Sequence, residues 1–258
     1  MPRYNFNLKP RILFIVILLS TLIIPFSNSL ALDRHYSSGR SKVSLVELFT
    51  SEGCSSCPPA EKWMTTLADD PDLWNRFVPV AFHVDYWDYI GWKDPFATPE
   101  YGLRQRLYRQ LGNIRTVYTP GMILDGKEWR KWSYKHSTPR TDKIVGNLDV
   151  VLRGDTISAT FKPASMKSNG DTDSTDWVIN VAVLGFDLTS FVKAGENAGR
   201  RLKQDFVVLK HEQKLSSDGH WTMMLPEIKP EIAKRIGLAV WVNKKGEQTP
   251  VQATGGWL

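Results

Sequence analysis

The two cysteines of the chain, Cys54 and Cys57, lie three positions apart between a predicted strand and a predicted helix. A Cys-x-x-Cys pair in a tight turn brings the two Cα atoms within reach of a disulfide bond, and the N-terminus of an adjoining helix lowers the pKa of the first thiol. We therefore predict that Cys54 is the attacking thiol and Cys57 the resolving thiol. This chemistry requires that the Cys54 sulfur is accessible to a substrate.

The segments on either side of the pair predict a strand before it and a helix after it. Residues 43–50 are apolar on both faces, which indicates a strand in a sheet that is covered on both sides. Glu47 is the one charged residue of this strand, and burial of a carboxylate is costly unless the group is paired or protonated. The helix is predicted to begin at Pro58 or Pro59, because proline is tolerated in the first helical turn.

A second predicted strand, residues 77–85, leads into an aromatic segment at residues 86–96. An exposed segment of this kind is typical of a lid or of a wall that binds a peptide, with Tyr86, Trp87 and Trp92 as the contacting side chains. In the alternative interpretation, the segment buries its rings against the edge of the domain.

A second helix and a short strand complete this part of the chain. The helix is predicted near residues 101–111, and Thr119-Pro120 stands at the head of the strand. Asp-Gly at 125–126 follows and indicates a hairpin turn.

This order of elements makes residues 43–135 resemble a thioredoxin-like domain. Three motifs in this part also resemble a family of bacterial exported proteins that is catalogued only as a domain of unknown function. The motifs include Cys-Ser-Ser-Cys-Pro-Pro and His-Val-Asp-Tyr-Trp-Asp-Tyr, and they span residues 47–60, 82–96 and 117–120. The resemblance implies an α/β thioredoxin-like fold but no settled activity.

The thioredoxin resemblance also implies roles for single residues. Cys54 would be the nucleophile and Cys57 the resolving thiol. Thr119 and Pro120 would stand where that fold has a cis-proline, beside which a substrate peptide pairs as an added strand. Glu47 falls one residue from the place of a buried acid that moves protons for the resolving cysteine. The two serines between the cysteines depart from the thioredoxin pattern, which leaves the direction, oxidising or reducing, open.

The second part of the chain reads as strands and turns, which predict a β-sandwich of about six strands. The predicted fold class is therefore an α/β thioredoxin-like domain, residues 42–146, followed by a smaller all-β sandwich-like domain, residues 147–258. The Gly-Glu-Asn-Ala-Gly-Arg loop at residues 195–200 is either a structural turn or a ligand loop.

Residues 1–31 have the basic start, apolar run and small-residue exit of a secretory signal peptide, with an uncleaved membrane anchor as the alternative. Export predicts a periplasmic or secreted protein, without stable membrane insertion after cleavage, in a compartment where a disulfide persists. The segment carries three basic and no acidic residues, so its removal lowers the formal net charge from +6 to +3. We therefore expect no nucleic-acid partner. Alternating basic and aromatic residues at 129–132 indicate either a charged hairpin edge or an anion-binding patch.

Three function hypotheses follow from these patterns. In the first, the protein is an exported thiol–disulfide oxidoreductase whose partners are protein or peptide thiols and disulfides, without a cofactor. In the second, the cysteines form a permanent clip in a binding module. In the third, the thiols bind a metal, although the five histidines fall at no ligand spacing and we predict no metal site.

Overall fold

The first part of the chain is assembled on β2 (Ser44–Thr50), which is buried along its whole length. β2 pairs in parallel with β3 (Phe77–His83) and antiparallel with β4 (Gly121–Leu124). Apolar side chains on both faces suit this central position, because both faces must be covered. The computed structural model describes residues 1–2, 33–134, 141–164, 176–229 and 231–258.

These strands belong to an eight-stranded mixed sheet in the order β14-β13-β8-β11-β3-β2-β4-β5. Its other members are β5 (Lys127–Glu128), β8 (Trp177–Phe186), β11 (Val207–Ser216), β13 (Arg235–Lys244) and β14 (Pro250–Trp257). β11 pairs antiparallel with β8 along its length, with an irregularity between Val208 and Lys210, and it joins β3 in parallel at Val207 opposite Ala81.

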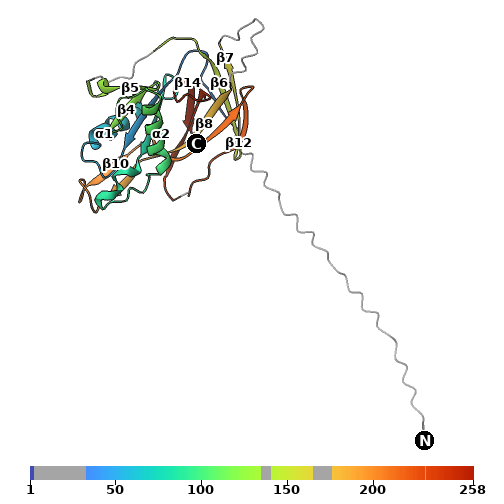
Figure 1. Ribbon diagram of the computed structural model, residues 1–258. Coiled ribbons are helices and arrows are strands. Elements are labelled where there is room, and N and C mark those ends of the chain that lie inside the picture. Colours follow the sequence, from blue (N-terminus) through green and yellow to red (C-terminus); the bar gives the residue numbers. More distant parts are fainter. Residues whose placement is uncertain (3–32, 135–140, 165–175, 230) are drawn as a thin grey trace. The chain divides into compact units, whose positions relative to one another are not determined.

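Two helices that begin with proline cover opposite faces of β2. They are α1 (Pro58–Thr66) and α2 (Pro99–Gln110), and Figure 1 shows both near β4 and β5. Thr50 contacts α1, whereas Glu47 contacts α2. Side chains alternate between the two faces of a strand, so positions 47 and 50 point to opposite sides. Short 3-10 helices are η1 (Leu67–Asp69), η2 (Asp85–Ile90) and η3 (Arg130–Tyr134).

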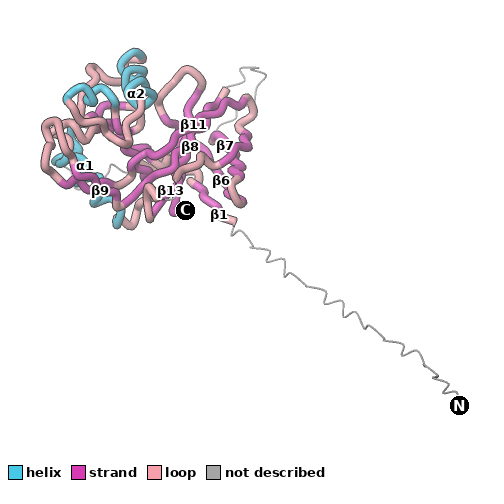
Figure 2. Tube along the Cα trace, turned by 90° about the horizontal axis from the view of Figure 1, so that it is seen from below, coloured by secondary structure: helices cyan, strands magenta, loops and turns pink. Residues whose placement is uncertain are grey.

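A separate antiparallel sheet packs on the large one. Its strands are β1 (Arg34–Ser37), β6 (Gly146–Arg153), β7 (Thr156–Pro163) and β12 (His220–Met224), in the order β1-β6-β7-β12. Leu148 and Ile157 share a core with Val181 of β8 and Val240 of β13. Figure 2 shows β8 and β13 between β6 and β7 on one side and α1 on the other. β9 (Leu188–Phe191) and β10 (Arg201–Gln204) form a two-stranded sheet.

The predicted fold class, an α/β thioredoxin-like domain followed by a smaller all-β sandwich-like domain, is wrong. The described chain is mostly β, and its main sheet takes strands from both sides of residue 146. The physical reason is that β3 is not an edge strand, because its second edge pairs with β11. The sheet continues from β11 through β8 and β13 to β14. Local patterns of apolar residues identify strands but not their distant partners.

Two further predictions concern the signal peptide and the division of the chain into two parts. The signal peptide falls on residues that lie outside the described part, apart from Met1 and Pro2. The division of the chain at residue 146 stays a prediction about sequence segments. Within the described residues, no helix combines the length and the apolar character that a membrane crossing needs.

Candidate functional site

Cys54 and Cys57 lie in the turn that joins β2 to α1. The Cys54 N–H donates to the carbonyl of Ser51 at 3.1 Å, and the Cys57 N–H donates to the carbonyl of Cys54 at 3.2 Å. Pro58 and Pro59 are the first two residues of α1, where a backbone N–H has no partner within the helix, so the prolines cost α1 no hydrogen bond. Both thiols are free. The turn therefore holds a reduced pair at the N-terminus of a helix.

The environment of Cys54 favours its thiolate. The pKa of Cys54 is lowered to about 6. The largest cause is a hydrogen bond from the Cys57 thiol, and a hydrogen bond with the Ser56 hydroxyl lowers the pKa further, whereas burial raises it. The Ser56 Oγ lies 3.2 Å from the Cys54 Sγ. Below pH 8 the attacking thiol is thus ionised to a much larger extent than an ordinary cysteine.

The environment of Cys57 favours its protonated form. Burial, together with the neighbouring Cys54, raises the pKa of Cys57 strongly. The Thr50 hydroxyl contacts the Cys57 thiol and donates to the Glu61 carboxylate at 2.7 Å. Burial also raises the pKa of Glu61, to about 7. A carboxylate with a near-neutral pKa therefore stands behind the resolving thiol, with one hydroxyl between them.

A buried ion pair supports the turn from the side of β3. The His83 Nδ1 lies 2.7 Å from the Asp94 Oδ2, and neither side chain is exposed by more than 1%. Burial is the largest single effect and lowers the pKa of His83, but the charge and hydrogen bond of Asp94, together with the charges of Glu61 and Glu52, raise the pKa to about 9. Asp94 also accepts the backbone N–H of Glu52 at 2.8 Å. The charged pair thus fixes the residue that stands two positions before Cys54.

Glu47, the predicted proton carrier, lies away from this group. Its carboxylate accepts the Arg104 Nε at 2.7 Å and the hydroxyl of Tyr108, both on α2. It therefore occupies the face of β2 opposite to Thr50 and Glu61. Sequence reasoning missed Glu61, although its position four residues after Cys57 on one helix face was a usable signal.

Thr119 and Pro120 lie in the segment next to Cys54. The peptide bond between them is cis, and the Thr119 carbonyl oxygen lies 3.9 Å from the Cys54 Sγ. The Trp87 Nε1 donates to the Thr119 Oγ1 at 2.7 Å. The structure therefore brings together Cys54, Cys57, Thr119, Pro120 and Trp87 among the predicted site residues.

Tyr86 and Trp92 make inward contacts. The Tyr86 hydroxyl donates to Gln105 of α2 at 3.0 Å, and the Trp92 Nε1 donates to the Glu52 carboxylate at 2.8 Å. These bonds agree with the alternative interpretation, in which the aromatic segment packs against the domain. Tyr89 of the same segment is 83% exposed.

The expected accessibility of Cys54 is not found. Cys54 is 1% exposed and Cys57 is fully buried. Trp87 bridges the two backbone segments that flank the Cys54 sulfur, because it bonds Thr119 on one side and packs on Gly53 on the other. A Cβ added at Gly53 would lie 3.3 Å from the Trp87 Cβ. In this structure the thiol site is therefore closed to solvent.

The second part of the chain reaches the cysteine turn through the loop at residues 195–200. Glu196 accepts the N–H and the hydroxyl of Ser55, at 2.8 and 2.7 Å. The buried Asn197 donates to the carbonyls of Glu52 and Cys54. Sequence reasoning identified the loop as well defined but did not connect it to the cysteines.

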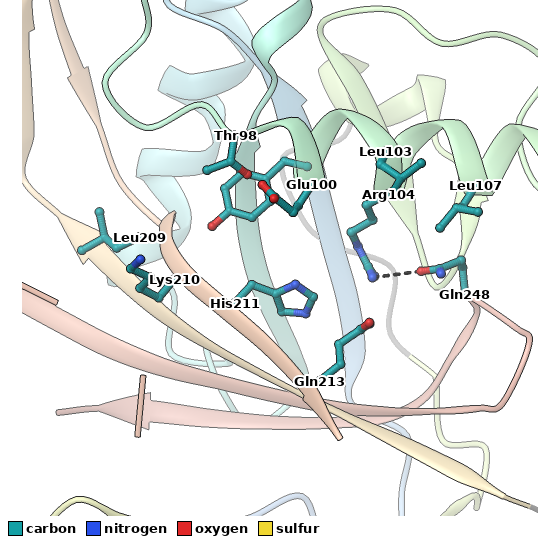
Figure 3. Close-up of a pocket in the computed structure, with 11 residues that line it drawn as sticks. Thr98, Glu100, Leu103, Arg104, Leu107, Leu209, Lys210, His211, Gln213 and Gln248 are labelled. Carbon is teal, nitrogen blue, oxygen red and sulfur yellow. Dashed lines mark hydrogen bonds between the residues drawn. The ribbon is translucent and has the colours of Figure 1, made fainter. Parts of the chain in front are cut away.

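A separate pocket of about 540 Å³ lies between α2 and β11 (Figure 3). Its wall includes Thr98, Arg104 and Lys210, and His211 stands near its centre. Burial lowers the pKa of His211 to about 3, so the ring is neutral. None of the predicted site residues lines this pocket. Among the residues that the structure describes, no group of three or more His, Cys, Asp and Glu side chains is placed to hold a metal ion.

Comparison with known proteins gives one family and two similar structures. The model of a family described as "Protein of unknown function (DUF1223)" matches residues 45–243. A crystal structure of a protein from Agrobacterium tumefaciens shares 24% identity, with a TM-score of 0.57, over 83% of this chain and 94% of that chain. HBP35 of Porphyromonas gingivalis shares 16% identity, with a TM-score of 0.52, over 84% of this chain and 76% of that chain. No curated protein matches. At these identities the two structures show similarity of fold alone.

Proposed function

This chain belongs to the family described as "Protein of unknown function (DUF1223)", and from its site we propose that it is a thiol–disulfide oxidoreductase that acts through Cys54 and Cys57. The observation that carries the proposal is that the pKa values of the two thiols shift in opposite directions. The Cys57 thiol donates to the Cys54 sulfur, so the pKa of Cys54 falls to about 6 while that of Cys57 rises. An attacking thiolate next to a protonated resolving thiol is the state from which thiol–disulfide exchange begins.

The exchange proceeds in two displacements. The Cys54 thiolate attacks one sulfur of a protein or peptide disulfide, which forms a mixed disulfide and releases the first substrate sulfur as a thiolate. Cys57 then loses its proton and attacks the Cys54 sulfur, which releases the second substrate sulfur. The substrate disulfide is reduced to two thiols while the cysteine pair is oxidised, and the reverse sequence oxidises a dithiol.

We propose that Glu61 is the base that accepts the proton of Cys57. Its carboxylate is reached through the Thr50 hydroxyl, and its pKa of about 7 suits a base that works near neutral pH. Glu47 has its carboxylate in an ion pair with Arg104 on the other face of β2, so it is not placed for this step.

The backbone at Thr119 is the place where we expect a substrate peptide to pair. Its carbonyl lies 3.9 Å from the Cys54 Sγ, within the reach of a strand that presents a sulfur to Cys54. Because Trp87 closes this place, substrate binding requires that η2 moves away from Thr119. We extend the proposal to an exported protein, from the signal-like residues 1–31.

A permanent disulfide clip is the second candidate function. The burial of both sulfurs favours it, because a buried cysteine is chemically inert unless the structure opens. In that case the pair would stabilise the turn, and the surface of the β strands would bind a partner.

A trapping experiment separates these candidates. Full-length Cys57→Ser, reduced and then mixed with a peptide disulfide, is expected to accumulate a mixed disulfide at Cys54, because the resolving thiol is missing. Cys54→Ser is the matched control and is expected to accumulate none. Mass spectrometry identifies the adduct and its position. No adduct with either variant, together with a reduction potential below about −300 mV for the wild-type pair, would establish the clip.

A further inference from the structure

The loop between β9 and β10 is built to reach across to the cysteine turn. Its ends are joined by two backbone hydrogen bonds between Val192 and the pair Gly199 and Arg200, at 2.8 and 3.0 Å. Gly195 has a φ of +75°, and a Cβ at this position would lie 2.8 Å from the Ile90 Cδ1. The loop therefore packs tightly against η2, beside the turn.

Asn197, at the tip of this loop, is fully buried, and all its side-chain hydrogen-bonding groups are satisfied. Its Nδ2 donates to the carbonyls of Glu52 and Cys54, both at 2.9 Å, and its Oδ1 accepts the Arg200 Nη1 at 2.9 Å. Two acceptors on one side of the amide and one donor on the other leave a single orientation for the group. Glu196 adds an exposed contact to Ser55.

We propose that Asn197 is a positioning residue of the thiol site, supplied by the second part of the chain: its amide holds the carbonyls of Glu52 and Cys54 and so fixes the turn that presents the Cys54 sulfur to its hydrogen-bond donors. The inference rests on the proposed function for its biological meaning. It also gives the loop at residues 195–200 a role in the chemistry of the cysteines.

The Cys54 thiolate is stable only while its hydrogen-bond donors are aligned with the sulfur. The Cys54 thiolate depends on donors from Cys57 and Ser56, which lie in the same turn. The Cys54 carbonyl accepts both the Cys57 N–H and the Asn197 amide, so this one oxygen ties the turn to the loop. Without the amide, two buried carbonyls lose a partner and the turn relaxes toward other conformations. The donors then spend less time in line with the sulfur.

The test uses two pairs of variants in the full-length reduced protein. Asn197→Ala removes the amide, and Asn113→Ala, whose amide bonds Thr249 elsewhere, is its control. Arg200→Ala removes the group that orients Asn197, and Arg201→Ala, the next residue and also exposed, is its control. The readouts are the pH profile of iodoacetamide labelling at Cys54, located by mass spectrometry, and the reduction potential of the pair.

We expect Asn197→Ala to raise the midpoint of the labelling profile by about one pH unit, which means roughly tenfold slower labelling of Cys54 near pH 5. The reduction potential should become more negative by about 30 mV, the same tenfold change converted, because a less stable thiolate disfavours the reduced form. Arg200→Ala should shift both readouts in the same direction by a smaller amount. If Asn197 only covered the turn, its removal would change the plateau of the labelling profile and leave the midpoint unchanged.

Midpoints and potentials that match those of the two controls would overturn the inference. If Asn197→Ala does not fold, as judged by circular dichroism, the exposed Arg200→Ala decides the question. If Cys54 of the wild-type protein takes no label in the folded state, that result contradicts the proposed function. The reduction potentials of the variants still decide the role of Asn197.

Discussion

Glu61 is the single residue whose chemistry can be tested most directly. It is 5% exposed, and burial raises its pKa to about 7. A base acts when it is deprotonated, so the rate at which Cys57 resolves a mixed disulfide should rise with pH through about 7. Glu61→Gln removes the base, and we expect resolution to slow by about 100-fold at pH 8 and to lose this step in the pH profile. Stopped-flow decay of a Cys54 mixed disulfide measures the rate.

The control for this variant is Glu100→Gln, which changes an exposed carboxylate on α2 and should leave resolution unchanged. A Glu61→Gln protein that resolves at the wild-type rate with the wild-type pH profile would remove Glu61 from the mechanism.

Glu47 and Glu61 show how far residue patterns alone can go. The thioredoxin resemblance implies a proton-carrying role for Glu47, whereas its place as the one charge in an apolar strand implies only that it needs a partner or a proton. That partner is Arg104, 57 positions later in the chain and identifiable only once α2 is packed on β2. Glu61 has the pattern of an ordinary helical glutamate, because its burial and its bond to Thr50 exist only once α1 is packed on β2.

We predict that η2 controls access to the thiol. Trp87 bonds Thr119 and packs on Gly53, so it joins the two segments that flank the buried Cys54. We expect Trp87→Ala to speed iodoacetamide labelling of Cys54 about tenfold at every pH, because removal of the cover raises access without changing the pKa. Each tenfold change corresponds to about 1.4 kcal/mol in the free energy of opening.

Tyr89→Ala is the matched control within the same element, since Tyr89 is 83% exposed. It should label at the wild-type rate. Equal labelling of the Trp87 and Tyr89 variants would show that another segment closes the site, and the loop at residues 195–200 would be the next to vary.

Most elements of the first part could be predicted, because their signals are local. Apolar runs predict β2 and β3, the two prolines predict the start of α1, and Asp-Gly at 125–126 predicts the hairpin of β4 and β5. The pairing of β11 with β3 could not be predicted, because it rests on one register match between residues 126 positions apart, Ala81 and Val207. Hence the elements were mostly right and the fold class was wrong.

At the scale of the whole described unit, from residue 33 onward, contacts that cross residue 146 join the two parts of the chain. One hydrophobic core includes Leu45 and Phe82 from the first part with Leu184 and Trp241 from the second. Arg104 lies over the rings of both Phe82 and Trp241, at 5.2 Å from each centroid. A core with members from both parts cannot lose one half without exposing the apolar surface of the other. We therefore expect the described unit to unfold as a whole.

Gln252 of β14 offers a test of this expectation. Its fully buried side chain accepts the N–H of Val43 at 2.8 Å and donates to the carbonyls of Gly146 and Ser41, at 2.7 and 3.0 Å. Gln252→Ala leaves these groups unpaired, and we expect it to lower the free energy of unfolding by about 2–4 kcal/mol. In urea, tryptophan fluorescence and circular dichroism should report one coincident transition, shifted to lower concentration in the variant, whereas Gln110→Ala at the exposed end of α2 should shift it little. Two separate transitions, of which the substitution moves only one, would mean that the two parts fold independently despite their common sheet.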